Sequence, residues 1–218
     1  MLTETRPPRQ RTTGPQVWAL TSGITGLVAN VLLVLFFLLA QPFGEVRQDF
    51  MWLGTANDWV IVVQFLTLIP VALALRRWLP ATRAVRLITA AAVVAMVGTA
   101  ALQLLLVAGI LGFEVQVWLV VPLFLLIYAW VLTASSTGHR HGTLPRPVTR
   151  FGLLLGVCFP VGLLIAAAGL PFGWGSVPQL AFGIPGIVIG AASWLALPLW
   201  PLDLARLVFS KPPSEPRL

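Results

Sequence analysis

Residues 17–40 read VWALTSGITGLVANVLLVLFFLLA, and this stretch contains no charged side chain. At a rise of 1.5 Å per residue, a helix of this length reaches about 36 Å, whereas the hydrocarbon core of a bilayer is about 30 Å thick. The apolar region of a cleaved signal peptide is shorter, usually about 7–15 residues. The stretch therefore predicts a membrane-spanning helix and not a cleaved leader.

The same kind of stretch recurs five times along the chain. The further apolar segments are 57–79, 84–111, 115–134, 151–170 and 179–200. Lipid offers no hydrogen-bond partners, so the backbone of each segment must satisfy itself, which favours helices. Unbroken apolar runs also differ from the alternation that a transmembrane β-barrel requires. We expect an all-α, polytopic membrane bundle of six transmembrane helices over residues 17–209, between cytoplasmic tails at 1–16 and 210–218.

Composition and charge placement support this membrane bundle. Of the 218 residues, 58% are hydrophobic and 10% are charged, against roughly 25% charged residues in a soluble domain. With the N-terminus inside, the inner segments contain 13 of the 14 basic residues, and only Arg47 lies outside. This asymmetry predicts cytoplasmic N- and C-termini. It also accounts for the net charge of +7 without nucleic acid, so the expected partners are the lipid bilayer and either another membrane protein or a second copy of the chain.

Nine tryptophans give a second indication of depth, because the indole ring favours the membrane interface. The residues predicted near inner helix ends are Trp18, Trp78, Trp130 and Trp200. Those predicted near outer ends are Trp52, Trp59, Trp118 and Trp174. Trp194 lies deeper and is expected to pack between helices. After the sixth span, Leu202–Phe209 is expected to form a short interfacial helix.

Beyond the first residue of each predicted span, four uncharged amides lie in the middle or the outer half of the membrane: Asn30, Gln64, Gln103 and Gln116. An amide that faces lipid is costly, so these side chains should face the interior of the bundle. Two interpretations remain open. The amides either hydrogen-bond helices together or line an outward-facing polar cavity for a small ligand.

Ionisable residues are expected only at helix ends. Asp58 and Glu114 lie at the outer ends of the second and fourth predicted spans, where they are either solvated or, for Asp58, cap the helix. Small residues spaced by four, as in the Gly152–Gly156 and Gly186–Gly190 pairs, predict close helix contacts.

Catalytic and cofactor motifs are not found in the sequence. Cys158 is the only cysteine, and His139 and His141 form too small a set for a metal site. Ser176 is predicted on the other side of the membrane from both histidines, so a Ser–His pair cannot form. We expect no catalytic residue, no cofactor and no bound metal.

The last third of the chain resembles a known type of protein. Gly142-Thr143-Leu144-Pro145-Arg146 precedes the glycine-rich start of the fifth span, and the sixth span ends in WLALPLW at 194–200. This pattern is similar to uncharacterised bacterial integral membrane proteins with six spans, grouped as domains of unknown function. The resemblance implies a bacterial cytoplasmic membrane protein and implies no activity. We therefore expect a non-enzymatic protein, either a small carrier or an accessory subunit of a membrane complex; the alternative is an intramembrane enzyme.

Overall fold

The computed structural model describes residues 14–41, 47–173 and 175–210, and this part of the chain is built from helices without strands. The long helices are α1 (Gly14–Leu35), α2 (Trp52–Leu75), α3 (Arg83–Val107), α4 (Phe113–Arg140), α5 (Arg146–Gly169) and α6 (Val177–Ala196). The shorter elements are η1 (Phe36–Ala40), η2 (Gln48–Phe50), η3 (Arg76–Trp78), η4 (Leu170–Phe172) and α7 (Leu199–Leu207).

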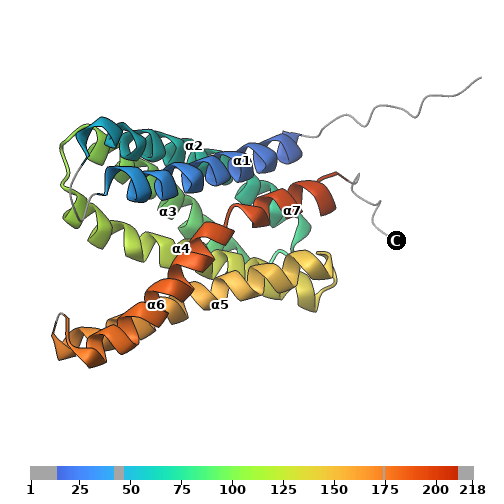
Figure 1. Cartoon of the computed structure of the whole chain (residues 1–218). Helices are drawn as coiled ribbons and strands as arrows, with labels where there is room; N and C mark the ends of the chain where they lie inside the picture. Colours follow the sequence, from blue (N-terminus) through green and yellow to red (C-terminus); the bar gives the residue numbers. More distant parts are fainter. Residues whose placement is uncertain (1–13, 42–46, 174, 211–218) are drawn as a thin grey trace, which may run out of the picture.

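Six helical segments of the described chain are long and apolar enough to cross a membrane. Consecutive helices run up and down and pack against one another, with α2, α3 and α4 between α1 and α5 (Figure 1). The predicted all-α bundle of six transmembrane helices is therefore confirmed. The loops between α2 and α3 and between α4 and α5 lie at the same end of the bundle as α7, and we name this end the arginine-rich end after Arg76, Arg77, Arg140 and Arg206.

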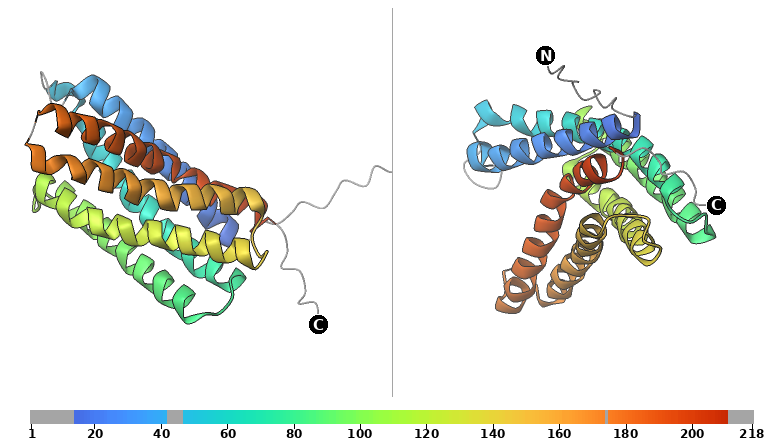
Figure 2. Two further views of the ribbon diagram at one scale, coloured as in Figure 1. Left: turned by 90° about the horizontal axis from the view of Figure 1, so that it is seen from below. Right: turned by 90° about the vertical axis from the view of Figure 1, so that its right-hand side faces the viewer.

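The short helix α7 lies inside the bundle instead of only along its surface. It packs against α1 and α5, and Figure 2 shows it where α1 and α6 diverge. Trp200 is fully buried, meets Trp130 edge to face at 5.2 Å, and donates a hydrogen bond from Nε1 to the Val148 carbonyl at 3.3 Å. A short helix thus overlaps the expected Leu202–Phe209 segment but runs from Leu199 to Leu207, and one of its faces belongs to the core.

Helices α5 and α6 approach closely because glycines face one another. A Cβ on Gly162 would lie 2.5 Å from the Gly190 nitrogen, and a Cβ on Gly186 would collide with the backbone of Ala166. Such contacts let two backbones meet without a polar driving force, as is common between helices in lipid. Gly156 makes a similar contact with Leu132 of α4.

Several boundaries and orientations differ from the sequence expectation. The helical segment of the second span begins near Gln48, well before residue 57, because Leu53 is buried and Gly54 packs against the Phe36 ring. The predicted inner belt is wrong for Trp130 and Trp200, which are at most 1% exposed and pack in the core. Trp194 packs edge to face on Phe124 as expected. Trp174 and most residues of the two tails lie outside the described residues.

Candidate functional site

Two of the four predicted amides come together at the end of the bundle opposite the arginine-rich end. Gln103 lies near the end of α3, and Gln116 lies in the first turn of α4. Gln103 meets Asp58, which lies six residues, or about 9 Å, after the start of α2, and Gln116 is connected to Asp58 through Gln103. We name Asp58, Gln103, Gln116 and the adjacent Asn57 the polar network.

The hydrogen bonds of the polar network all run, from donor to acceptor, towards the carboxylate of Asp58. Gln116 Nε2 donates to Gln103 Oε1 at 2.9 Å, and Gln103 Nε2 donates to Asp58 Oδ1 at 2.5 Å. Asn57 Nδ2 also lies 3.5 Å from Asp58 Oδ1, at the limit of a hydrogen bond. Each amide dipole therefore points its donor towards the carboxylate, which stabilises the negative charge. The chain of bonds joins three different helices.

The network is largely excluded from solvent. Asn57, Gln103 and Gln116 are about 5% exposed, and Asp58 is half-buried. Asn57 Oδ1 has no hydrogen-bond partner among the described residues. The capping role considered for Asp58 is wrong, because α2 begins at Trp52 and Asp58 lies inside the helix, where Gln103 binds it.

Asn30 and Gln64 occupy a second polar region, between α1, α2 and the junction of α6 with α7. Asn30 Nδ2 donates to the Leu195 carbonyl of α6 at 2.7 Å. Gln64 is buried on α2 and faces Gly26, since a Cβ added there would lie 2.7 Å from Gln64 Nε2. Ser22 of α1 donates to the backbone carbonyl of Gln64 at 3.2 Å. No hydrogen bond links this region to the polar network in the described part of the chain.

The remaining chemically active side chains are distributed over both ends of the bundle. Ser176 caps α6 by accepting from the Gln179 amide, whereas His139 and His141 lie at the other end of the 24-residue helix α5. Glu114 is exposed in the first turn of α4. Cys158 is half-buried on α5. The described residues include no group of three His, Cys, Asp or Glu side chains that could hold a metal ion.

Sequence reasoning missed two contributors to these contacts. Asp58 was expected at a helix end and not as the acceptor of the network. The signal that could have found it is the occurrence of one carboxylate and two glutamines at the same end of three consecutive spans. Tyr128 was also missed, although its hydroxyl donates to the Ser193 carbonyl at 3.1 Å and thus joins α4 to α6. A lone tyrosine in a span needs such a partner when it is fully buried.

Comparison with known proteins gave no match for this chain among protein-family models, curated proteins or solved structures.

Proposed function

We propose that this chain is a non-enzymatic, multi-pass protein of the bacterial cytoplasmic membrane that works as an accessory subunit of a membrane complex. The observation that carries the proposal is the use of the side-chain amides. Asn30, Gln103 and Gln116 each donate to a group on another helix of the same chain. Their hydrogen-bonding capacity stabilises the bundle, as expected for packing residues, whereas a carrier needs such groups for its ligand.

The arrangement of the helices agrees with an accessory role. Half of the residues in the apolar stretch of the second span are buried, compared with 22% in each of the first, fifth and sixth spans. Helix α6 packs mainly on α5, and it exposes large apolar side chains such as Ile184, Ile187 and Val188. A peripheral helix of this kind contacts lipid, a partner protein or a second copy of the chain.

A small carrier is the second candidate, and the carboxylate of Asp58 is the observation that favours it. An ionisable group within a membrane span is an established pointer to ion or solute pathways. The nearby Asn57 Oδ1 lacks a partner among the described residues and could accept a bond from a ligand. An intramembrane enzyme would need a nucleophile, acid or base within reach of Asp58.

Cysteine accessibility distinguishes an accessory subunit from a carrier. Single cysteines replace Asn30, Gln64 and Gln103 in a chain whose native Cys158 is changed to Ala, and intact cells are treated with a membrane-impermeant thiol reagent. A cysteine at the exposed Gln48 is the positive control. An accessory subunit leaves all three positions unlabelled, because Gln64 and Gln103 are buried and Asn30 is half-buried against α6. Labelling at Gln103 that a solute suppresses would instead favour the carrier.

The proposed orientation has its own test. Topology reporters fused after Gln48 and after His141 should report opposite sides of the membrane, with His141 in the cytoplasm, because the intervening chain crosses three times. Reporters on the same side would refute the proposed topology.

A further inference from the structure

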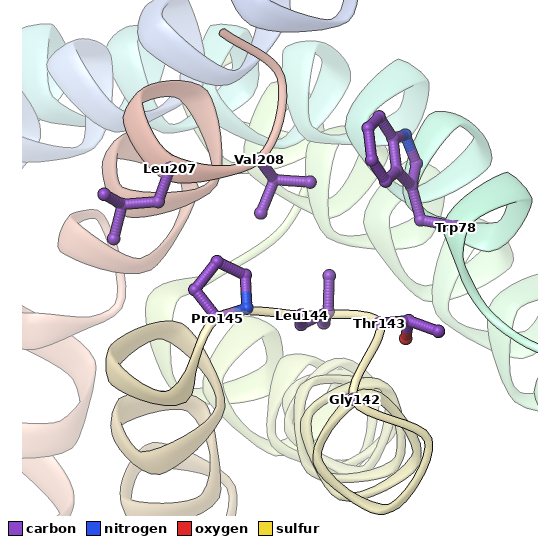
Figure 3. Close-up of a pocket in the computed structure, with 7 residues that line it drawn as sticks. All are labelled: Trp78, Gly142, Thr143, Leu144, Pro145, Leu207 and Val208. Atoms are coloured by element: carbon purple, nitrogen blue, oxygen red, sulfur yellow. The ribbon is translucent and has the colours of Figure 1, made fainter. Parts of the chain in front are cut away.

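A cavity of about 280 Å³ opens at the arginine-rich end, where three segments distant in sequence meet. Its lining comes from η3, from the turn between α4 and α5, and from the end of α7 (Figure 3). The residues are Trp78, Gly142, Thr143, Leu144, Pro145, Leu207 and Val208. Leu144 and Val208 are buried, whereas Gly142 and Thr143 are exposed at the rim. The volume lies just below the roughly 300–1,000 Å³ of sites for drug-sized ligands, so it suits part of a larger molecule.

The charged residues close in sequence to the cavity lining are positive, with a single exception. Arg77 precedes Trp78, Arg146 follows Pro145, and Arg206 precedes Leu207, and all three arginines are exposed. The exception is Asp203, which is half-buried one turn earlier on α7. None of the three arginines forms an ion pair within residues 14–41, 47–173 and 175–210. An apolar cavity thus opens at the arginine-rich end, and three exposed arginines without ion pairs in the described residues neighbour its lining residues in sequence.

We propose that this cavity binds one anionic phospholipid, whose phosphate faces the three arginines and whose glycerol and proximal acyl groups contact Trp78, Leu207 and Val208. Basic pockets between membrane helices recognise anionic headgroups in this way. Arginine is suited to phosphate because its planar donors bind two oxygens at once. The cavity lies at the ends of the spanning helices, which is the headgroup level of a bilayer that the six spans cross. A lipid bound here bridges α7 to the α4–α5 turn and to η3.

Native mass spectrometry of the full chain in a neutral detergent tests the proposal. The probes are phosphatidylglycerol and phosphatidylcholine, supplied separately and in competition. We expect one phosphatidylglycerol to be retained per chain in preference to phosphatidylcholine. Equal retention of the two lipids would overturn the proposal. Inorganic phosphate at matched ionic strength should not displace the lipid, and complete displacement would show that the site recognises a free anion.

Two pairs of substitutions locate the site. The variant R77Q/R206Q removes two cations next to the lining and should weaken phosphatidylglycerol binding about thirtyfold, from about 1 kcal/mol for each basic residue. The control variant R86Q/R150Q removes two exposed arginines of the same end that are not adjacent to the lining, and it should change binding less than threefold. Equal losses in both variants would show general surface attraction and would overturn a defined site.

A third variant tests the cavity itself and separates binding from folding. Thr143→Trp fills the mouth of the cavity while it leaves every arginine in place, and it should abolish the preference for phosphatidylglycerol. Each variant is also unfolded by heat in lipid-free detergent, where all three should melt close to the parent because the changed residues are exposed. Retained preference in a folded Thr143→Trp variant would show that the lipid binds elsewhere.

Discussion

Two regions of the bundle achieve helix contact by different means. At the end opposite the arginines, α2, α3 and α4 are joined by the hydrogen bonds of the polar network. Between α5 and α6 the contact depends on glycines, with Gly162 and Gly186 against the opposite backbone. A substitution in the polar network removes one or two hydrogen bonds and leaves the helices in place. An atom added to a glycine between α5 and α6 would instead collide with the opposite backbone. The two regions should therefore respond differently to substitution.

The largest expected effect is in the glycine contact. Gly186→Ala places a methyl group against the backbone of Ala166, which cannot move aside as a flexible side chain would. We expect a loss of about 2 kcal/mol in the free energy of unfolding, typical of overpacking. The measurement is equilibrium unfolding in mixed micelles, followed by circular dichroism.

The matched control for this prediction is Gly190→Ala, one turn further along α6. No atom lies within 4 Å of a Cβ built at Gly190. Helix propensity then favours alanine, so the variant should be as stable as the parent or up to about 1 kcal/mol more stable. If the two variants lose equal stability, helix flexibility and not the close contact explains the glycines.

The polar network should show an intermediate effect. Gln103→Leu removes the donor to Asp58 and the acceptor of Gln116, and it leaves both partners buried or half-buried. We expect a loss of about 1.5 kcal/mol, near the upper end of hydrogen bonds measured between membrane helices. The same unfolding assay applies.

A double-mutant cycle shows whether the network acts as one unit. Gln103→Leu and Gln116→Leu combined should cost less than the sum of the two single changes, because both remove the same bond. Gln48→Leu, at an exposed position of η2, should change stability by less than about 0.5 kcal/mol. Strict additivity of the pair would argue that Gln103 and Gln116 stabilise the bundle independently.

The smallest expected effect is at the contact between α1 and α6. Asn30→Leu removes the bond to the Leu195 carbonyl and should cost about 0.6 kcal/mol, the average for such bonds in membranes. Thr25→Val is the control, since the Thr25 hydroxyl bonds only to carbonyls of its own helix. A Thr25→Val variant as destabilised as Asn30→Leu would mean that the contact across helices adds no stability.

The sequence predicted the number of helices and their type because membrane thickness imposes a minimum length on every span. It did not predict which face of each helix is buried. Apolar residues surround every span, so no periodicity separates the lipid-facing side from the core, and Trp130 and Trp200 were therefore placed by depth alone. The early start of α2 is not predictable from the local sequence. The first turn of this helix is stabilised by the contact between Gly54 and the Phe36 ring, and these residues are distant in sequence.

The candidate site was predictable only in part. The four amides follow from the cost of exposing polar groups to lipid, and the structure finds Gln64, Gln103 and Gln116 buried. The pairing of Gln103 with Gln116, and the separate pairing of Asn30 with Leu195, depend on helix rotation. Rotation is determined by the packing of glycines and aromatic rings along the whole length of each helix, which single-residue reasoning does not capture.

The position of α7 sets an order of events during synthesis. Translation proceeds from the N-terminus, so all six spans leave the ribosome before α7 can pack between α1 and α5. Until then Gly23 of α1, against which Leu202 of α7 packs, lacks this cover. The docking of α7 is thus a late step of folding, and it connects the first helix of the chain to the fifth.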